Sequence, residues 1–168
     1  SSTSRGLGDV YKRQEQYQSV MGVNLSSFLS FFKGAKLPVE KVSWEDAMAF
    51  CKKLNEKEKN RIPEGWAFSL PTESQWEYAC RAGTTTRYFW GEKINSDWAN
   101  YGESGYEKTR VVGSYRPNSW GFYDMHGNVW ELCSDWYGSY PSGTLTNPTG
   151  PALSLIHISE PTRRRGIS

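Results

Sequence analysis

The sequence contains no long hydrophobic run. Its 168 residues are 37% hydrophobic with a mean hydropathy of −0.69, and the longest apolar stretch lies near residues 28–32. A helix that crosses a bilayer needs about 20 apolar residues, so a membrane span is excluded. Disorder is excluded as well, because 8 Trp, 10 Tyr and 7 Phe bury enough surface to offset the entropy of the chain. The length fits one globular domain.

Cysteine and histidine are scarce. The three cysteines, Cys51, Cys80 and Cys133, are far apart in the sequence, and neither CxxC nor HxxxH spacing occurs. A zinc site that includes His126 is therefore disfavoured. For the cysteines, a role as small buried core residues is favoured over a role as copper ligands. His126 has no partner visible in the sequence, so a turn residue is favoured over a catalytic base.

The net charge of +2 comes from the two ends of the chain. Residues 1–13 and 153–168 each carry a net charge of +2, which leaves 14 basic and 16 acidic residues in 14–152. Both ends resemble translated adapter sequence, so we expect non-native segments at 1–13 and 153–168 and one partial domain at 14–152. The alternative is a basic tail for nucleic acid or anionic lipid. It is disfavoured because three arginines without interleaved aromatics make a weak patch.

Helical patterns are confined to the first half of the chain. A short helix is expected over residues 15–21 with Gly22 as its stop. Capping boxes predict two further helix starts, at Ser43 with Asp46 and at Thr72 with Gln75, and the second helix should end at Gly83. The first capped helix should pack through an apolar stripe of Trp44, Ala47, Met48, Cys51 and Leu54. Residues 84–151 predict loops and short strands, and no internal repeat occurs.

The segment 118–131 contains two carboxylates that a turn brings close together. Asp124 and Glu131 flank a Gly-Asn turn, so the chain is able to present both carboxylates with the carbonyls of Gly127 and Val129. Mixed oxygen ligands of this kind suit Ca²⁺. The alternative is an ordinary hairpin turn without metal, since Gly-Asn between apolar residues is also typical of hairpins.

Three long motifs carry a family resemblance. Residues 38–51 (PVEKVSWEDAMAFC), 70–83 (LPTESQWEYACRAG) and 121–131 (GFYDMHGNVWE) resemble the formylglycine-generating enzyme, or sulfatase-modifying factor, family. The resemblance runs from about Glu15 to Pro151. Leu132 departs from the family, which usually has a second Trp there, and we expect a change of packing rather than of function.

The resemblance implies an α+β fold, a C-type lectin-like variant with little regular secondary structure and incomplete at both ends. It implies an oxidoreductase that converts the Cys of a Cys-x-Pro-x-Arg segment in a sulfatase to formylglycine with O2 and copper. It also implies structural calcium held by Asp124, Gly127, Val129 and Glu131. A second family calcium site would begin at Asn100 and Tyr101, but its later acidic ligand is replaced here by Ser104 unless Glu103 substitutes.

The family's copper-binding cysteines follow a stretch that this chain departs from at Pro151. We therefore expect a central fragment that is itself inactive, a monomer, without nucleic-acid partners and of bacterial origin, cytoplasmic or exported. In family members with disulfides, cysteines at the positions of Cys51 and Cys80 pair with partners in that later stretch. Two alternatives stay open: a lectin-like binding or sensor module of the same fold, and a domain of an iron-dependent sulfoxide synthase. The Trp and Tyr residues either line a peptide groove or, as favoured, fill the core.

Overall fold

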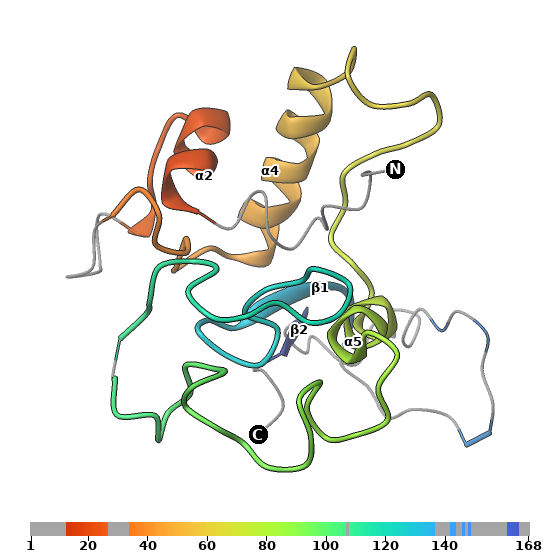
Figure 1. Cartoon of the computed structure of the whole chain (residues 1–168). Helices are drawn as coiled ribbons and strands as arrows, with labels where there is room; N and C mark the ends of the chain where they lie inside the picture. Colours follow the sequence, from red (N-terminus) through yellow and green to blue (C-terminus); the bar gives the residue numbers. More distant parts are fainter. Residues whose placement is uncertain are drawn as a thin grey trace, which may run out of the picture.

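The computed structural model describes residues 13–26, 34–106, 108–136, 142–143, 146 and 148 and the backbone of 161–164. The elements in chain order are α2 (Gln14–Met21), α4 (Trp44–Lys57), α5 (Glu73–Arg81), β1 (Glu131–Trp136) and β2 (Pro161–Arg164) (Figure 1). Helices, one antiparallel strand pair and long irregular stretches agree with the α+β expectation. No helix in the described ranges has both the length and the apolar character needed to cross a membrane.

Helices α2 and α4 form one part of the core. Tyr17 of α2 stacks on Phe50 of α4 with ring centroids 5.3 Å apart, and Leu54 lies beside them at 2% exposure. Burial of each such side chain contributes about 2 kcal/mol. As predicted, α2 ends at Gly22, which adopts a left-handed φ of 81° and donates its N–H to Gln18 O at 2.8 Å.

The capping box of α4 is confirmed, but its predicted apolar stripe is partly wrong. Ser43 Oγ accepts from Asp46 N at 3.1 Å, and Asp46 Oδ2 accepts from Ser43 N at 3.1 Å. Met48, assigned to the stripe, is 38% exposed. The buried face is instead centred on Phe50 and Leu54, because that side of the helix faces Tyr17 of α2.

Helix α5 packs on β1. The predicted capping box is present, with Thr72 Oγ1 accepting from Gln75 N at 3.2 Å. Trp76 and Cys80 on its inner face form a second core cluster with Met125 and Cys133. The helix ends one residue earlier than its predicted stop at Gly83, because Ala82 already adopts a left-handed φ of 46°.

Strands β1 and β2 pair antiparallel. Glu131 lies opposite Arg164 and Trp136 opposite Pro161, with an irregularity in the register between Leu132 and Trp136. Strand β2 lies within 153–168, the segment set apart on its sequence. The division of the chain at residue 152 stays a prediction.

The second half of the chain is held with little regular structure. Between α5 and β1, the described residues contain no helix or ladder strand, only an isolated bridge between Tyr88 and Gly91. In Figure 1 the first part of this connection, in green, runs on the side of the strand pair opposite to α2 and α4, whereas its later part, in teal, runs beside β1. The predicted metal ligands all lie on it or at its end.

Candidate functional site

The predicted metal-binding segment, residues 124–131, folds back on itself. Asp124 and Asn128 adopt left-handed φ values of 55° and 74°, which Asp and Asn tolerate better than most residues. Gly127 N donates to Asp124 O at 3.3 Å, and Val129 N donates to Gly127 O at 3.0 Å. The turn between the two predicted carboxylates is therefore present.

Gly127 lies directly against Asn100. A Cβ at Gly127 would be 2.1 Å from Asn100 O, a distance at which no side chain fits. The next residue, Asn128, donates its backbone N–H to the same carbonyl at 2.7 Å. The absence of a side chain at Gly127 thus permits the 124–131 turn to bind the segment around Asn100. We call Asn100, Gly127 and Asn128 the asparagine junction.

The side chains of the junction bind a third segment. Asn128 Oδ1 accepts from Arg110 N at 2.8 Å, and Asn128 Nδ2 donates to Arg110 O at 3.1 Å. Asn100 Nδ2 donates to Lys108 O at 2.8 Å and to Asn128 Oδ1 at 3.3 Å. Two amide side chains therefore connect three irregular segments. They form hydrogen bonds with backbone N–H and C=O groups that are not paired in a β-sheet.

The two predicted carboxylates bind different partners. Asp124 Oδ2 accepts from Gly113 N at 2.8 Å, whereas Glu131 Oε2 accepts from Trp76 Nε1 at 2.5 Å. Within the part of the chain that the structure describes, no three His, Cys, Asp or Glu side chains converge on a metal site. A calcium ion here would depend on carbonyl oxygens, such as those of Gly127 and Val129, as well as on carboxylates. Oxygen donors of this mixed kind fit calcium, and the site stays a prediction.

The other two predicted ligands lie in one turn with Ser104. Ser104 Oγ is 3.0 Å from Asn100 Oδ1 and 2.7 Å from Tyr101 O, and it accepts from Tyr101 N at 3.3 Å. Ser104 N also donates to Tyr101 O at 2.9 Å. Glu103, the possible substitute ligand, is exposed. Asn100 belongs to the junction, so the two predicted metal sites adjoin each other.

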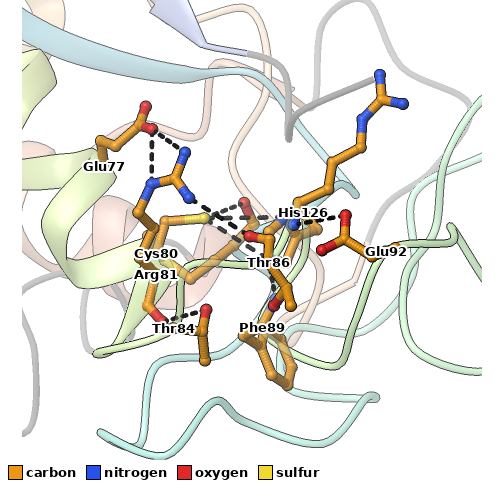
Figure 2. A network of polar contacts seen from close by, with 10 residues as sticks. Glu77, Cys80, Arg81, Thr84, Thr86, Phe89, Glu92 and His126 are labelled. Carbon is orange, nitrogen blue, oxygen red and sulfur yellow. Dashed lines mark hydrogen bonds and ion pairs between the residues drawn. The ribbon is translucent and has the colours of Figure 1, made fainter.

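A second polar cluster surrounds His126. The side chain is 3% exposed, and its Nε2 accepts from Phe89 N at 3.3 Å. Cys80 Sγ lies 3.8 Å from Nδ1 and 3.7 Å from Nε2 and donates to Met125 O at 3.6 Å. Figure 2 shows this cluster next to the ion pair of Arg81 with Glu77.

The environment of His126 keeps its imidazole neutral. Burial, followed by the nearby Arg81 guanidinium, lowers the pKa of His126 to about 4. Three rings lie around the imidazole, with centroid distances of 5.3, 5.4 and 4.8 Å for Tyr88, Phe89 and Trp90. A neutral ring with an accepting Nε2 carries its proton on Nδ1.

The partners of His126 were missed from the sequence. His126 was interpreted as a turn residue, and it does lie in the turn, but it is also a buried part of the core. Its partners Cys80 and Phe89 are about 40 residues away, and no periodicity relates them. The available signal was the aromatic run at 88–90, which has to be buried somewhere.

The cysteines agree with the core interpretation. Cys80 and Cys133 have no exposed surface, and Cys51 is half-buried on α4, where burial raises the pKa of its thiol. A thiol with a raised pKa is a weak nucleophile at neutral pH. None of the three is placed as an accessible metal ligand.

An exposed aromatic pair lies over α5. Tyr78 and Trp120 are 69% and 40% exposed, and their ring centroids are 4.8 Å apart at 61°. The loop carrying Trp120 is fixed by Asn118, whose Nδ2 donates to Ala79 O at 2.7 Å and whose Oδ1 accepts from Trp120 N and Phe122 N at 3.1 Å. The loop that carries Trp120 is thus held by partly buried hydrogen bonds, while both rings of the pair remain exposed.

Comparison with known proteins places the chain in a family. A profile of the Sulfatase-modifying factor enzyme 1-like domain matches residues 7–163. The formylglycine-generating enzyme of Mus musculus is 37% identical over 139 residues, covering 73% of this chain and 34% of that protein. The enzyme of the same name from Streptomyces coelicolor is 36% identical, covering 72% and 40%.

A solved structure supports the same grouping. The structure of Treponema denticola variable protein 1 is similar with a TM-score of 0.69 and 31% identity, covering 83% of this chain and 66% of that one. The chain spans about a third of the length of the curated relatives it matches. By the profile match and these identities, the chain belongs to the sulfatase-modifying factor family of formylglycine-generating enzyme-like domains.

Proposed function

We propose that this chain forms part of a formylglycine-generating oxidase with a C-type lectin-like fold. Such an enzyme converts the Cys of a Cys-x-Pro-x-Arg segment in a sulfatase to formylglycine, using O2 and copper. The observation that carries the proposal is the identity of 36–37% to enzymes of that name over nearly three quarters of the chain. Since the chain spans about a third of those relatives, the activity, the substrate and the copper belong to the proposal.

The described residues do not fit the copper centre. Copper that reacts with O2 and a substrate thiol needs soft ligands at an accessible position. Cys80 and Cys133 are fully buried, and Cys51 stands apart from them on α4. We therefore assign the described residues a framework role and place the copper ligands outside them.

The oxidation proposal is tested by mass spectrometry of a peptide. A Cys-x-Pro-x-Arg peptide is incubated with O2 and Cu⁺, either with this 168-residue chain or with the protein that its whole gene encodes. We expect formylglycine from the whole gene product and none from the chain alone. A whole gene product that forms no formylglycine but binds the peptide would contradict the oxidase and favour a binding module.

We also propose calcium at Asp124, Gly127, Val129 and Glu131. The support is that the turn presents these residues with oxygen donors of the kind calcium prefers. At a calcium concentration about a hundredfold above Kd, we expect Tm to rise by about 5 °C relative to EDTA. The Asp124→Asn protein keeps the acceptor for Gly113 N and loses the charge, so it should lose this rise. Asp97→Asn, at an exposed carboxylate, serves as the control.

The binding module is the second candidate, and the Tyr78–Trp120 pair favours it. Exposed aromatic rings on a loop held by partly buried hydrogen bonds lose little entropy on binding, and Trp and Tyr are enriched among residues that dominate binding energy. Replacing Trp120 by Ala should weaken peptide binding at least tenfold if this surface is used. Unchanged affinity would remove the pair from the binding surface.

A further inference from the structure

We propose that in this chain the hydroxyl of Ser104 takes the place of a cation in the 100–104 turn, which is therefore closed without metal. The sequence resemblance implies a second calcium ion here, held in part by Asn100 and Tyr101. The described contacts disagree with that implication. The inference stands on the geometry of this turn and does not depend on the proposed oxidase activity.

The carbonyl of Tyr101 has no oxygen lone pair left for a cation. It accepts from Ser104 N at 2.9 Å and from Ser104 Oγ at 2.7 Å. A carbonyl oxygen has two lone pairs, so these two donors saturate it. A calcium ion at this oxygen would have to displace a hydrogen bond inside a half-buried turn.

The amide oxygen of Asn100 faces the same hydroxyl. Asn100 is 8% exposed, and its Nδ2 is fixed on Lys108 O at 2.8 Å, which directs Oδ1 to Ser104 Oγ at 3.0 Å. Two acceptors therefore converge on one hydroxyl, whose proton serves the shorter contact to Tyr101 O and is shared with Asn100 Oδ1. A donor at the centre of converging oxygens performs the neutralising role that a cation has in a calcium site.

Among the described residues, no charged side chain replaces the acidic ligand that the family resemblance implies at Ser104. The acidic side chain of the turn, Glu103, is exposed. On the other side, the Asn100 amide is bound to Asn128, which holds the backbone of Arg110. In the described part of this region, the oxygens that contact Ser104 are therefore neutral, whereas anionic ligands give oxygen sites their affinity for calcium.

The inference predicts that one substitution makes the 100–104 turn depend on calcium, which the turn of the parent chain does not. Ser104→Asp would remove the donor and place a carboxylate beside two acceptor oxygens, an arrangement that repels unless a cation bridges it. Ser114→Asp is the matched control. Ser114 has the same turn position, donating both N and Oγ to Val111 O at 3.2 and 2.5 Å, but no converging Asn side chain is described there.

The experiment measures Tm in EDTA and in 5 mM CaCl2 for variants of the Asp124→Asn chain, in which the first predicted site lacks its charge. We expect the Asp124→Asn chain and Ser114→Asp to show no calcium-dependent shift. Ser104→Asp should melt about 3 °C lower in EDTA and recover with calcium. Ser104→Ala should melt lower in both buffers, because it loses the donor without gaining a ligand.

Two results would overturn the proposal. One is a calcium-dependent rise in the Asp124→Asn chain that Ser104→Ala abolishes, which would make the hydroxyl a cation ligand. The other is a Ser104→Asp protein that behaves like Ser114→Asp, which would show that the oxygens do not converge. If Ser104→Asp fails to fold, calorimetric titration of the parent decides: at most one calcium per chain supports the proposal, and two contradict it. No readout uses oxidase activity, so failure of the oxidase proposal is seen separately.

Discussion

The helical part and the loop part of this domain are stabilised in different ways. In α2, α4 and α5, local backbone hydrogen bonds define each element, and capping boxes begin α4 and α5. Apolar side chains join α2 to α4, and α5 to Met125 and Cys133. In the described residues between 83 and 130, asparagine side chains replace regular structure. Asn100 and Asn118 are buried and Asn128 is half-buried, and each binds backbone groups of other segments. An irregular region can therefore have a fixed geometry when side chains form the hydrogen bonds to backbone N–H and C=O groups that helices and sheets form internally.

The largest effect on the loop part of the domain is expected from a substitution at Gly127. Gly127→Ala would place a Cβ 2.1 Å from Asn100 O and separate the segments of the asparagine junction. We expect a loss of about 4 kcal/mol in the free energy of unfolding, or failure to fold. Urea denaturation measures it.

Gly121→Ala is the control for the Gly127 substitution. Gly121 has a left-handed φ of 85° but nothing within 4 Å of an added Cβ, so its cost should be only about 1 kcal/mol. Equal costs for the two alanines would mean that close approach at the junction is unimportant.

The pH dependence tests the His126 cluster. The pKa of His126 is lowered from 6.5 to about 4, so the unfolded chain binds the proton more tightly than the folded one. The contribution of His126 to the free energy of unfolding is therefore fully present above pH 6.5. It decreases as the pH falls toward 4, by at most about 3 kcal/mol. Urea denaturation of the parent and of His126→Gln between pH 4 and 7 separates the pH dependence due to His126 from that due to the carboxylates, which both proteins share. Parallel curves for the two proteins would refute a buried neutral imidazole.

Asn118 tests whether side-chain bonds support the loop that carries Trp120. Asn118→Ala removes the donor to Ala79 O and the acceptor for Trp120 N and Phe122 N, all partly buried. We expect a loss of about 2 kcal/mol, measured by urea denaturation. Asn95→Ala, which removes one exposed bond to Asp97 N, should cost about 0.5 kcal/mol. If both substitutions cost the same, burial adds nothing to the bonds of Asn118.

The smallest expected effect is at the helix caps. Ser43→Ala removes one half of the α4 capping box and should cost about 1 kcal/mol, because packing against Tyr17 keeps the helix in place. Thermal unfolding measures it. A larger loss of stability than for Asn118→Ala would contradict the account, because the helix cap would then contribute more than the hydrogen bonds of Asn118.

The sequence predicted the helical part well because its signals are local. Capping boxes and the Gly22 stop lie within a few residues of the groups they bind, so spacing alone reveals them. The stripe on α4 was partly wrong because burial of Phe50 over Met48 depends on where α2 lies. Tertiary packing decides between two adjacent helix faces that are both apolar in the sequence.

The turn between Asp124 and Glu131 was predictable from the sequence, but its contacts with other segments were not. Spacing brought Asp124, Gly127 and Asn128 into one turn, and the turn is there. The sequence did not predict that Asn100 lies against Gly127 or that Cys80 lies against His126. These residues belong to distant segments, and no sequence periodicity relates them. Such contacts depend on the whole core.

The most direct test of the contrast between helices and loops is amide hydrogen exchange at three positions. Asn128 N–H binds Asn100 O, Arg110 N–H binds Asn128 Oδ1, and Leu54 N–H lies inside α4. If asparagine bonds hold the loops as firmly as helical bonds hold α4, the first two amides should be protected to within about tenfold of Leu54. Exchange of Asn128 and Arg110 at the rate of an unstructured peptide, with Leu54 still protected, would contradict it.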